Sequence, residues 1–216
     1  MTIDSKNILK SILDSMSRID YIKPEDIPNI PLYMDQVTTF MDSQLASSKR
    51  YEDDKILTKT MINNYAKNSL IPPPVKKKYS KEHLLMLIFV YYFKSILSIS
   101  DIQTLLKPLN EKYFSGTEKL NLTDLYEEVF SLEKGQVDHM VKDIIRQYDI
   151  AEKTFQGVPQ EDAEFLHQFS FICMLSVDVY VKKQIIEKLI DQMAAKAEPE
   201  PHDKKEKKEK KNSSLS

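Results

Sequence analysis

The scarcity of glycine constrains this chain more than any other feature of its sequence. Only 3 glycines occur among 216 residues, whereas an average usage of roughly 7% would give about 15. Glycine supplies the positive φ angles of tight strand connections and the close backbone approach of phosphate-binding loops. Such a chain is poorly suited to a many-stranded fold or to most nucleotide-binding enzymes, and we expect it to be mainly α-helical.

The remaining composition is that of an ordinary globular protein. Hydrophobic residues make up 41% of the chain, charged residues 30%, and the formal net charge is −2. The chain as a whole is therefore not attracted to nucleic acid, and any DNA binding must depend on a local group of basic residues. The N-terminus lacks the apolar core of a signal peptide, and the longest apolar run, 84–93, is too short to cross a bilayer. We expect a cytoplasmic protein that contacts no membrane.

Residue types that commonly carry catalysis or bind metals are scattered. The single cysteine, Cys173, lies in an apolar run and is expected to be a buried packing residue. The histidines are His83, His139, His167 and His202. They have no carboxylate or cysteine at ligand spacing, so no metal site is predicted, and His83 is expected to face solvent. Neighbouring acids such as Glu127 and Glu128 point apart on a helix. We expect no enzymatic activity and no cofactor.

Apolar residues recur at helical spacing along most of the chain. The segments with this spacing are 5–19, 32–45, 59–68, 81–97, 102–106, 136–151 and 161–195. Proline clusters at 24–31 and 72–74 separate neighbouring helices, because proline cannot continue a helix. The 81–97 segment is apolar on most sides and is expected at the centre of its domain. From Lys196 onward lysine and glutamate dominate, and we expect this tail to be disordered.

The segment 57–79 carries the residues that are most informative about function. Thr58 stands at the N-cap position of the predicted 59–68 helix. The residues expected on its buried face are Met61, Ile62 and Tyr65. The polar side chains on its other face are Lys59, Thr60, Asn63, Asn64 and Lys67. After the prolines, 75–79 fits the return strand of a minimal hairpin. The side chains of interest on this strand are Lys76, Lys77, Lys78 and Tyr79.

This combination of residues suits a DNA-binding surface. An asparagine amide can form two hydrogen bonds with adenine, and lysines and hydroxyls bind phosphates and fix the register. The residues that we expect to contact DNA are Lys59, Thr60, Asn63, Asn64, Tyr65, Lys67, Lys76, Lys77, Lys78 and Tyr79. The alternative is that the lysines are a solvated surface run and the asparagines merely end a helix.

The order of these motifs resembles the N-terminal DNA-binding domain of MerR-type regulators. The matching segments are Met61–Tyr65, Leu70–Pro73, Tyr79–Leu84 and Ile99–Ile102. The chain is also similar, over roughly residues 25–190, to the bacterial family called domain of unknown function 1836. That similarity is carried by Leu32–Val37, Thr58–Tyr65 and Lys76–Ser80. The resemblance implies a winged helix-turn-helix in which Tyr65 takes the place of the second MerR tyrosine.

The chain departs from the MerR pattern at several positions. Asn63 and Asn64 stand where MerR proteins carry arginine and tyrosine, and Ser69 stands where they carry glycine. Lys76–Tyr79 replaces the usual Gly-Tyr-Arg segment of the wing. The resemblance therefore implies the architecture, while base-reading residues are not transferred from it.

These observations predict four parts. They are an N-terminal helix (1–24), a MerR-like winged helix-turn-helix (25–110), a helical extension for dimerisation or effector response (111–195) and a disordered tail (196–216). The expected function is that of a sequence-specific transcriptional regulator that binds double-stranded DNA as a homodimer, with an effector that remains to be identified. The alternative is a helical protein-interaction module that has lost DNA binding.

Overall fold

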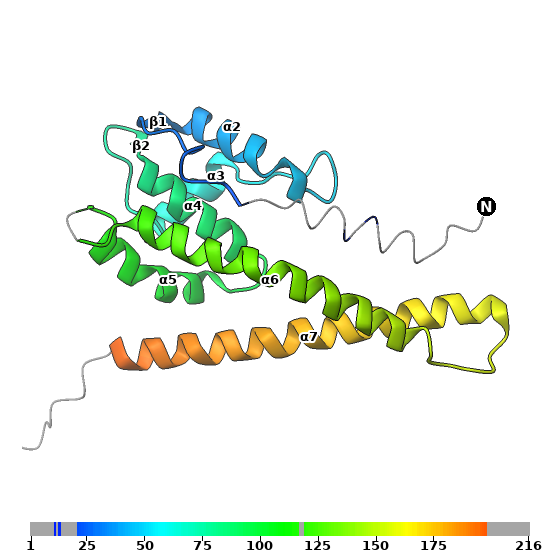
Figure 1. Ribbon diagram of the computed structural model, residues 1–216. Coiled ribbons are helices and arrows are strands. Elements are labelled where there is room, and N and C mark those ends of the chain that lie inside the picture. The colour runs from blue at the N-terminus through cyan, green and yellow to red at the C-terminus, as the bar shows by residue number, and fades with distance from the viewer. Residues whose placement is uncertain (1–10, 12, 14–20, 117–118, 198–216) are drawn as a thin grey trace, which may run out of the picture.

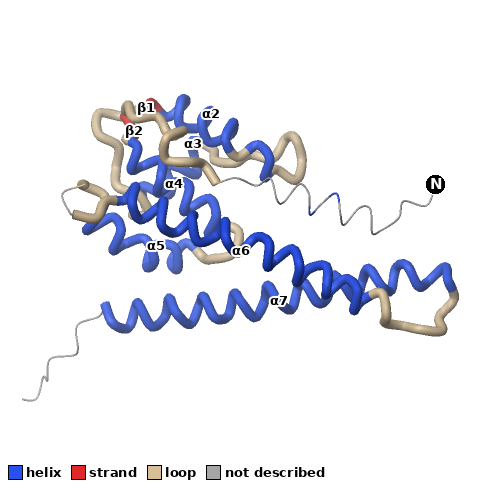
Figure 2. Tube along the Cα trace, viewed as in Figure 1, coloured by secondary structure: helices blue, strands red, loops and turns tan. Residues whose placement is uncertain are grey.

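The computed structural model of this mainly helical protein describes residues 11, 13, 21–116 and 119–197. The expected helix over 5–19 and the tail beyond residue 197 therefore lie outside the described residues. The elements are β1 (Leu32–Tyr33), α2 (Met34–Gln44), α3 (Lys59–Lys67), β2 (Lys78–Tyr79), α4 (Lys81–Phe93), α5 (Ile99–Pro108), α6 (Leu122–Ala151) and α7 (Gln160–Ala197), with short helical turns η1 (Ala46–Ser48) and η2 (Leu109–Tyr113) (Figures 1 and 2). The expectation of a mainly α-helical fold is confirmed.

Helix α4 lies at the centre of the first part of the chain. Every residue from His83 to Val90 is buried, as expected for a helix that is apolar on most sides. It contacts α5, α6 and β2. Its first turn is closed by Ser80, whose backbone N–H donates to Nδ1 of His83 at 3.0 Å. The short β2 strand and the cap before α4 thus position the segment that follows α3.

The small sheet pairs strands that are far apart in the sequence. β1 runs antiparallel to β2, with Leu32 opposite Tyr79 and Tyr33 opposite Lys78. The sequence predicts a minimal hairpin within 70–79. The tight turn is present at Val75–Lys78, but the ladder partner of its return strand is β1, which precedes α2. Because nothing near 75–79 in the sequence signals this pairing, the partner strand was not predictable from local patterns.

The hydrophobic core continues past the expected domain boundary at residue 110. Leu122, Tyr126 and Phe130, all from the first turns of α6, belong to the core that α2 to α5 form. The hydroxyl of Tyr126 donates to the backbone carbonyl of Ile22 at 2.7 Å. The start of α6 is therefore part of the first domain, and only the later part of α6 leaves it.

Helices α6 and α7 form a long hairpin that projects from the domain (Figure 1). Phe171 of α7 packs edge-on against Tyr148 of α6, with ring centroids 5.4 Å apart, and α7 then runs back beneath α5. Cys173 is exposed on α7, so the expectation of a buried packing thiol is wrong. Among the described helices, none has the length and apolar composition that crossing a membrane requires.

Candidate nucleic-acid interface

Helix α3 turns a polar face outward because its sequence separates two kinds of side chain. Thr58 caps it, since the Met61 N–H donates to Oγ1 of Thr58 at 3.2 Å. Ile62 and Tyr65 are buried, and Met61 is half-buried. The predicted polar residues that are exposed are Lys59, Thr60, Asn63, Asn64 and Lys67. The structure therefore brings five of the predicted site residues together on one short, anchored helix.

The end of α3 is held by a backbone motif that normally uses glycine. The Leu70 N–H donates to the Tyr65 carbonyl at 2.9 Å, and the Ser69 N–H donates to the Ala66 carbonyl at 3.2 Å. This is the Schellman pattern, and Ser69 takes the left-handed position with φ of 56°. The amide Nδ2 of Asn110, in η2, donates to the carbonyls of Ser69 and Leu70. The C-terminus of α3 is thus tied to the segment that leads into α6.

The two asparagines of α3 present their amides to solvent. Within the described part of the chain, no hydrogen bond holds the side chain of Asn63 or Asn64. Lys59 forms an ion pair with Asp35 of α2, and both side chains are largely exposed. An exposed pair of this kind contributes only about 0–1 kcal/mol. A phosphate could therefore replace Asp35 as the partner of Lys59.

The turn that follows α3 presents two lysines in a strained backbone conformation. Val75 and Lys78 exchange backbone hydrogen bonds of 3.1 and 2.9 Å. Lys76 and Lys77 between them have φ angles of 50° and 64°. Positive φ at both central residues is the signature of a type I′ turn, which favours asparagine and glycine. Each lysine here costs on the order of 1 kcal/mol relative to glycine. Both side chains are exposed at the tip.

Lys78 differs from its two neighbours. Its ammonium lies 5.0 Å from the centroid of the Tyr33 ring, across the β1–β2 ladder, and Lys78 is half-buried. Val75, at the other end of the turn, is 72% exposed. Lys78 therefore helps to hold the hairpin, while Lys76, Lys77 and Val75 form its free tip. Tyr33 was missed in the sequence because its position beside Lys78 depends on the long-range strand pairing.

Two of the predicted contact residues belong to the core. Tyr65 and Tyr79 are buried, and burial raises the pKa of both hydroxyls. The predicted position of Tyr65 on the buried face of α3 is confirmed, and neither Tyr65 nor Tyr79 presents its ring on the surface as a direct DNA contact would require. Tyr65 is on the apolar face of α3, and Tyr79 packs edge-on against His83 with centroids 5.4 Å apart. Each ring instead supports the element that carries the exposed residues.

His83 was expected to face solvent, but it is buried. Its ring lies between Tyr79 and Phe114, with a centroid distance of 4.7 Å to Phe114. Burial lowers the pKa of His83, while the nearby carbonyls of Pro73 and Pro72 and the Glu82 carboxylate act in the opposite direction. The neutral ring accepts the Ser80 N–H through Nδ1. The sequence signal for its burial was the apolar character of α4 on every side.

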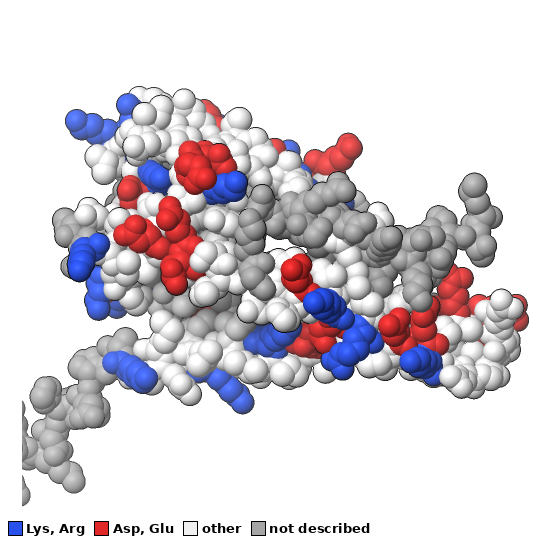
Figure 3. All heavy atoms as spheres, viewed as in Figure 1, with Lys and Arg blue, Asp and Glu red and all other residues white. Residues whose placement is uncertain are grey.

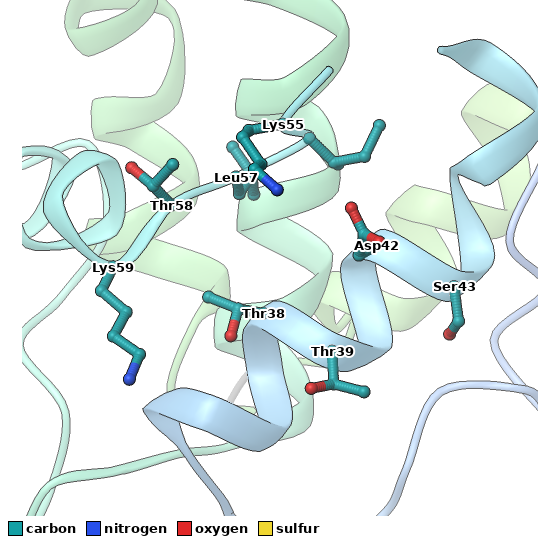
Figure 4. A pocket seen from close by; sticks show the side chains of 9 residues that line it. Thr38, Thr39, Asp42, Ser43, Lys55, Leu57, Thr58 and Lys59 are labelled. Carbon is teal, nitrogen blue, oxygen red and sulfur yellow. The ribbon is translucent and has the colours of Figure 1, made fainter. Parts of the chain in front are cut away.

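An open hollow of about 450 Å³ lies beside the start of α3 (Figure 4). Thr38, Thr39, Asp42 and Ser43 of α2 line one side, and Lys55, Ile56, Leu57, Thr58 and Lys59 line the other. The hydroxyls of Thr38 and Thr39 donate to the Asp35 carbonyl. In the described residues, no group of three or more His, Cys, Asp or Glu side chains is placed to hold a metal ion. The hollow, with both polar and apolar lining residues, borders the exposed face of α3.

Charge on the surface is mixed rather than uniformly basic. On the face shown in Figure 3, acidic and basic side chains are interspersed, and Lys and Arg atoms gather at the edge beside β1 and β2. Attraction of a polyanion would therefore depend on the local lysines of α3 and the hairpin tip.

Comparison with known proteins identifies a match to a protein family. The family model described as Domain of unknown function (DUF1836) matches residues 22–129. The matched region ends within α6, earlier than the span of 25–190 expected from the sequence, and it contains α3, the 75–78 turn and most of the core residues. No curated protein and no solved structure matches the chain.

Proposed function

The chain belongs to the DUF1836 family, and we propose that it is a sequence-specific DNA-binding protein that regulates transcription. In this proposal the first domain is a MerR-like winged helix-turn-helix, α3 reads bases in the major groove, and the 75–78 turn is the wing. The domain departs from a simple helix-turn-helix in one respect. The connection between α2 and α3 spans residues 45–58, whereas the turn of a simple helix-turn-helix has about 3–4 residues.

The observation that carries the proposal is the joint exposure of amides and lysines on two elements that follow each other in the chain and are both next to α2 or its strand partners. Asn63 and Asn64 are exposed on a helix that is capped at both ends, and Lys76 and Lys77 are exposed on a two-residue turn. Strain of this kind persists where the surrounding structure holds it, and it is concentrated at functional sites. A glycine-containing turn would be more stable, so the lysines are better explained by binding than by folding.

The expected chemistry follows from the side chains. The asparagine amides can bond N6 and N7 of adenine, so the preferred site should require at least one A·T pair. Lys59, Lys67, Lys76 and Lys77 are exposed and can each neutralise a phosphate. Four such contacts would give a slope of log affinity against log salt of about −3.6. This is weak binding for a single domain, which suits a protein that engages two half-sites.

Selection of bound fragments from genomic DNA by the purified full-length chain tests the proposal. The expected result is enrichment of a short motif containing A·T pairs, bound at least about tenfold more tightly than random DNA at moderate salt, in keeping with the discrimination that base contacts give. Retention without enrichment would indicate nonspecific attraction only. Absence of salt-sensitive binding to any fragment would contradict the proposal.

A second function is favoured by a different observation. Apolar side chains of Ile30, Tyr33 and Val75 are more than half exposed near the small sheet, and exposed apolar groups often mark protein contacts. The alternative is a protein-interaction module that uses this end of the domain. Substitution of Tyr33 and Val75 by serine separates the two, because it should abolish partner binding in the alternative and leave base preference unchanged in the DNA-binding proposal.

A further inference from the structure

Helix α7 carries a row of exposed apolar residues at every fourth position. The row, which we call the α7 row, consists of Phe165, Phe169, Cys173, Val177, Val181, Ile185, Leu189 and Met193. Apart from Cys173, which is also exposed, their exposure runs from 40% at Met193 to 66% at Phe165. No member of the row carries a charge. An uninterrupted apolar row of eight members is unusual on a helix that faces solvent.

The contacts that α7 makes within the chain leave this row uncovered. Near its start, Phe171 packs on Tyr148 of α6 and His167 contacts the Thr154 carbonyl through Nε2. Near its end, Ile190 is buried in the core of the first domain. Different faces of α7 therefore pack against the chain in its two halves, and the row stays on the free side of both. Contacts within one chain therefore leave many apolar side chains of α7 exposed to solvent.

The exposed area is large enough to matter for assembly. Eight side chains that are each about half exposed, two of them aromatic rings of roughly 150 Å² or more and six of them smaller, offer a few hundred Å² of apolar surface. A monomer rarely exposes a contiguous apolar patch larger than a few hundred Å². Because the row turns about 40° around the helix axis at each step, two crossing helices would bury its central members, and a second copy would cover the most exposed part of the middle of α7.

Charge along α7 favours a second copy in the opposite direction. Residues 160–181 contain four acids, Glu161, Asp162, Glu164 and Asp178, and no lysine or arginine. Residues 182–197 contain four lysines and two acids. An antiparallel neighbour sets the acidic half of one helix toward the basic half of the other, whereas a parallel one opposes like charges.

We propose that the α7 row is the seam of a symmetric dimer in which two α7 helices cross in antiparallel fashion. Residues four apart form a ridge that is inclined to the helix axis, and two identical ridges interlock into each other's grooves. This arrangement differs from a heptad coiled coil, whose seam would follow alternating steps of three and four residues. Val177 and Val181 lie at the middle of the row and therefore at the crossing point.

Sedimentation velocity of the full-length chain at micromolar concentration, without DNA, tests the seam. The parent should sediment as a dimer, and the Val177→Glu/Val181→Glu variant should sediment as a monomer with unchanged helical circular dichroism. Val179→Glu is the matched control, because Val179 is 62% exposed, close to the 61% of Val177, but lies outside the row. It should remain a dimer. A monomeric parent, or a dimer that Val179→Glu disrupts and the row variant does not, would overturn the proposal.

Cross-linking provides a readout that requires no destabilising substitution. In a Cys173→Ser background, Val177→Cys should form a covalent dimer with a short bismaleimide, and Val179→Cys should not. Equal yields from both positions would contradict a seam along the row. Because neither experiment contains DNA, failure of the dimer leaves the DNA-binding proposal standing, and loss of DNA binding leaves the seam intact.

Discussion

Ser69 shows how a single residue at the end of α3 can lower stability. Its φ of 56° is a conformation that a side chain disfavours by about 1–2 kcal/mol. Part of the gain on removing the side chain is offset by the greater freedom of glycine in the unfolded chain. We therefore expect Ser69→Gly to raise the free energy of unfolding by about 0.5–1 kcal/mol, measured by urea denaturation. Asn68, with φ of −90°, is the control, and Asn68→Gly should lower stability. A Ser69→Gly variant that is less stable than the parent would contradict the left-handed conformation assigned to Ser69.

His83 makes the stability of the first domain sensitive to mild acid. Burial lowers the pKa of His83 below its usual value near 6.5. Below pH 6.5 the unfolded chain therefore takes up a proton that the folded chain does not, and stability falls as pH falls toward the folded pKa. The slope contributed by one group is at most about 1.4 kcal/mol per pH unit.

Thermal or urea unfolding of His83→Asn across this pH range measures the effect. The variant should lose the part of the pH dependence that His83 contributes, whatever its absolute stability. The same steep fall in parent and variant would show that another group is responsible.

At the scale of elements, the hairpin tip is the simplest part of the site to test. Lys76→Gln/Lys77→Gln should flatten the slope of log affinity against log salt by about 1.8, because each phosphate contact contributes about 0.9. Sequence preference should not change, since these lysines contact the backbone in the proposal. Anisotropy titrations of labelled DNA at several salt concentrations give the slope. Lys188→Gln/Lys196→Gln, on α7, is the matched control, and an equal effect there would remove the hairpin from the interface.

Several elements of this fold were predictable because their signals are local. The Thr58 cap, the polar and apolar faces of α3 and the central position of α4 all follow from residues within one or two turns. The exposed set Lys59, Asn63 and Asn64 followed from the same periodicity. These predictions needed no knowledge of the tertiary structure.

The features that sequence patterns missed depend on partners far along the chain. Tyr79 is buried because β2 pairs with β1, some 45 residues earlier. The burial of His83 had a local signal in the apolar character of α4, but the ring that covers it, Phe114, lies beyond α5. Cys173 is exposed because the packed face of α7 changes between its two halves, which periodicity within a single helix does not reveal.

At the scale of the whole molecule, the two proposals assign DNA binding to the first domain and dimerisation to the α6–α7 helical hairpin. The family match covers most of the domain and the start of α6 as far as residue 129, including the core residue Tyr126, and the core residue Phe130 follows directly after it. The distal parts of α6 and α7 lie outside it. If both proposals hold, the α7 seam places two copies of α3 on one DNA molecule, and half-site spacing then reports the geometry of the dimer.

The central claim is that α3 reads DNA sequence, and competition binding of the full-length chain measures it most directly. Asn63→Ala and Asn64→Ala should each weaken binding to the selected motif by about 1–3 kcal/mol and leave binding to random DNA nearly unchanged. Asn29→Ala, at an exposed asparagine outside α3, should behave as the parent. If all three variants bind the motif and random DNA as the parent does, α3 is not the reading helix.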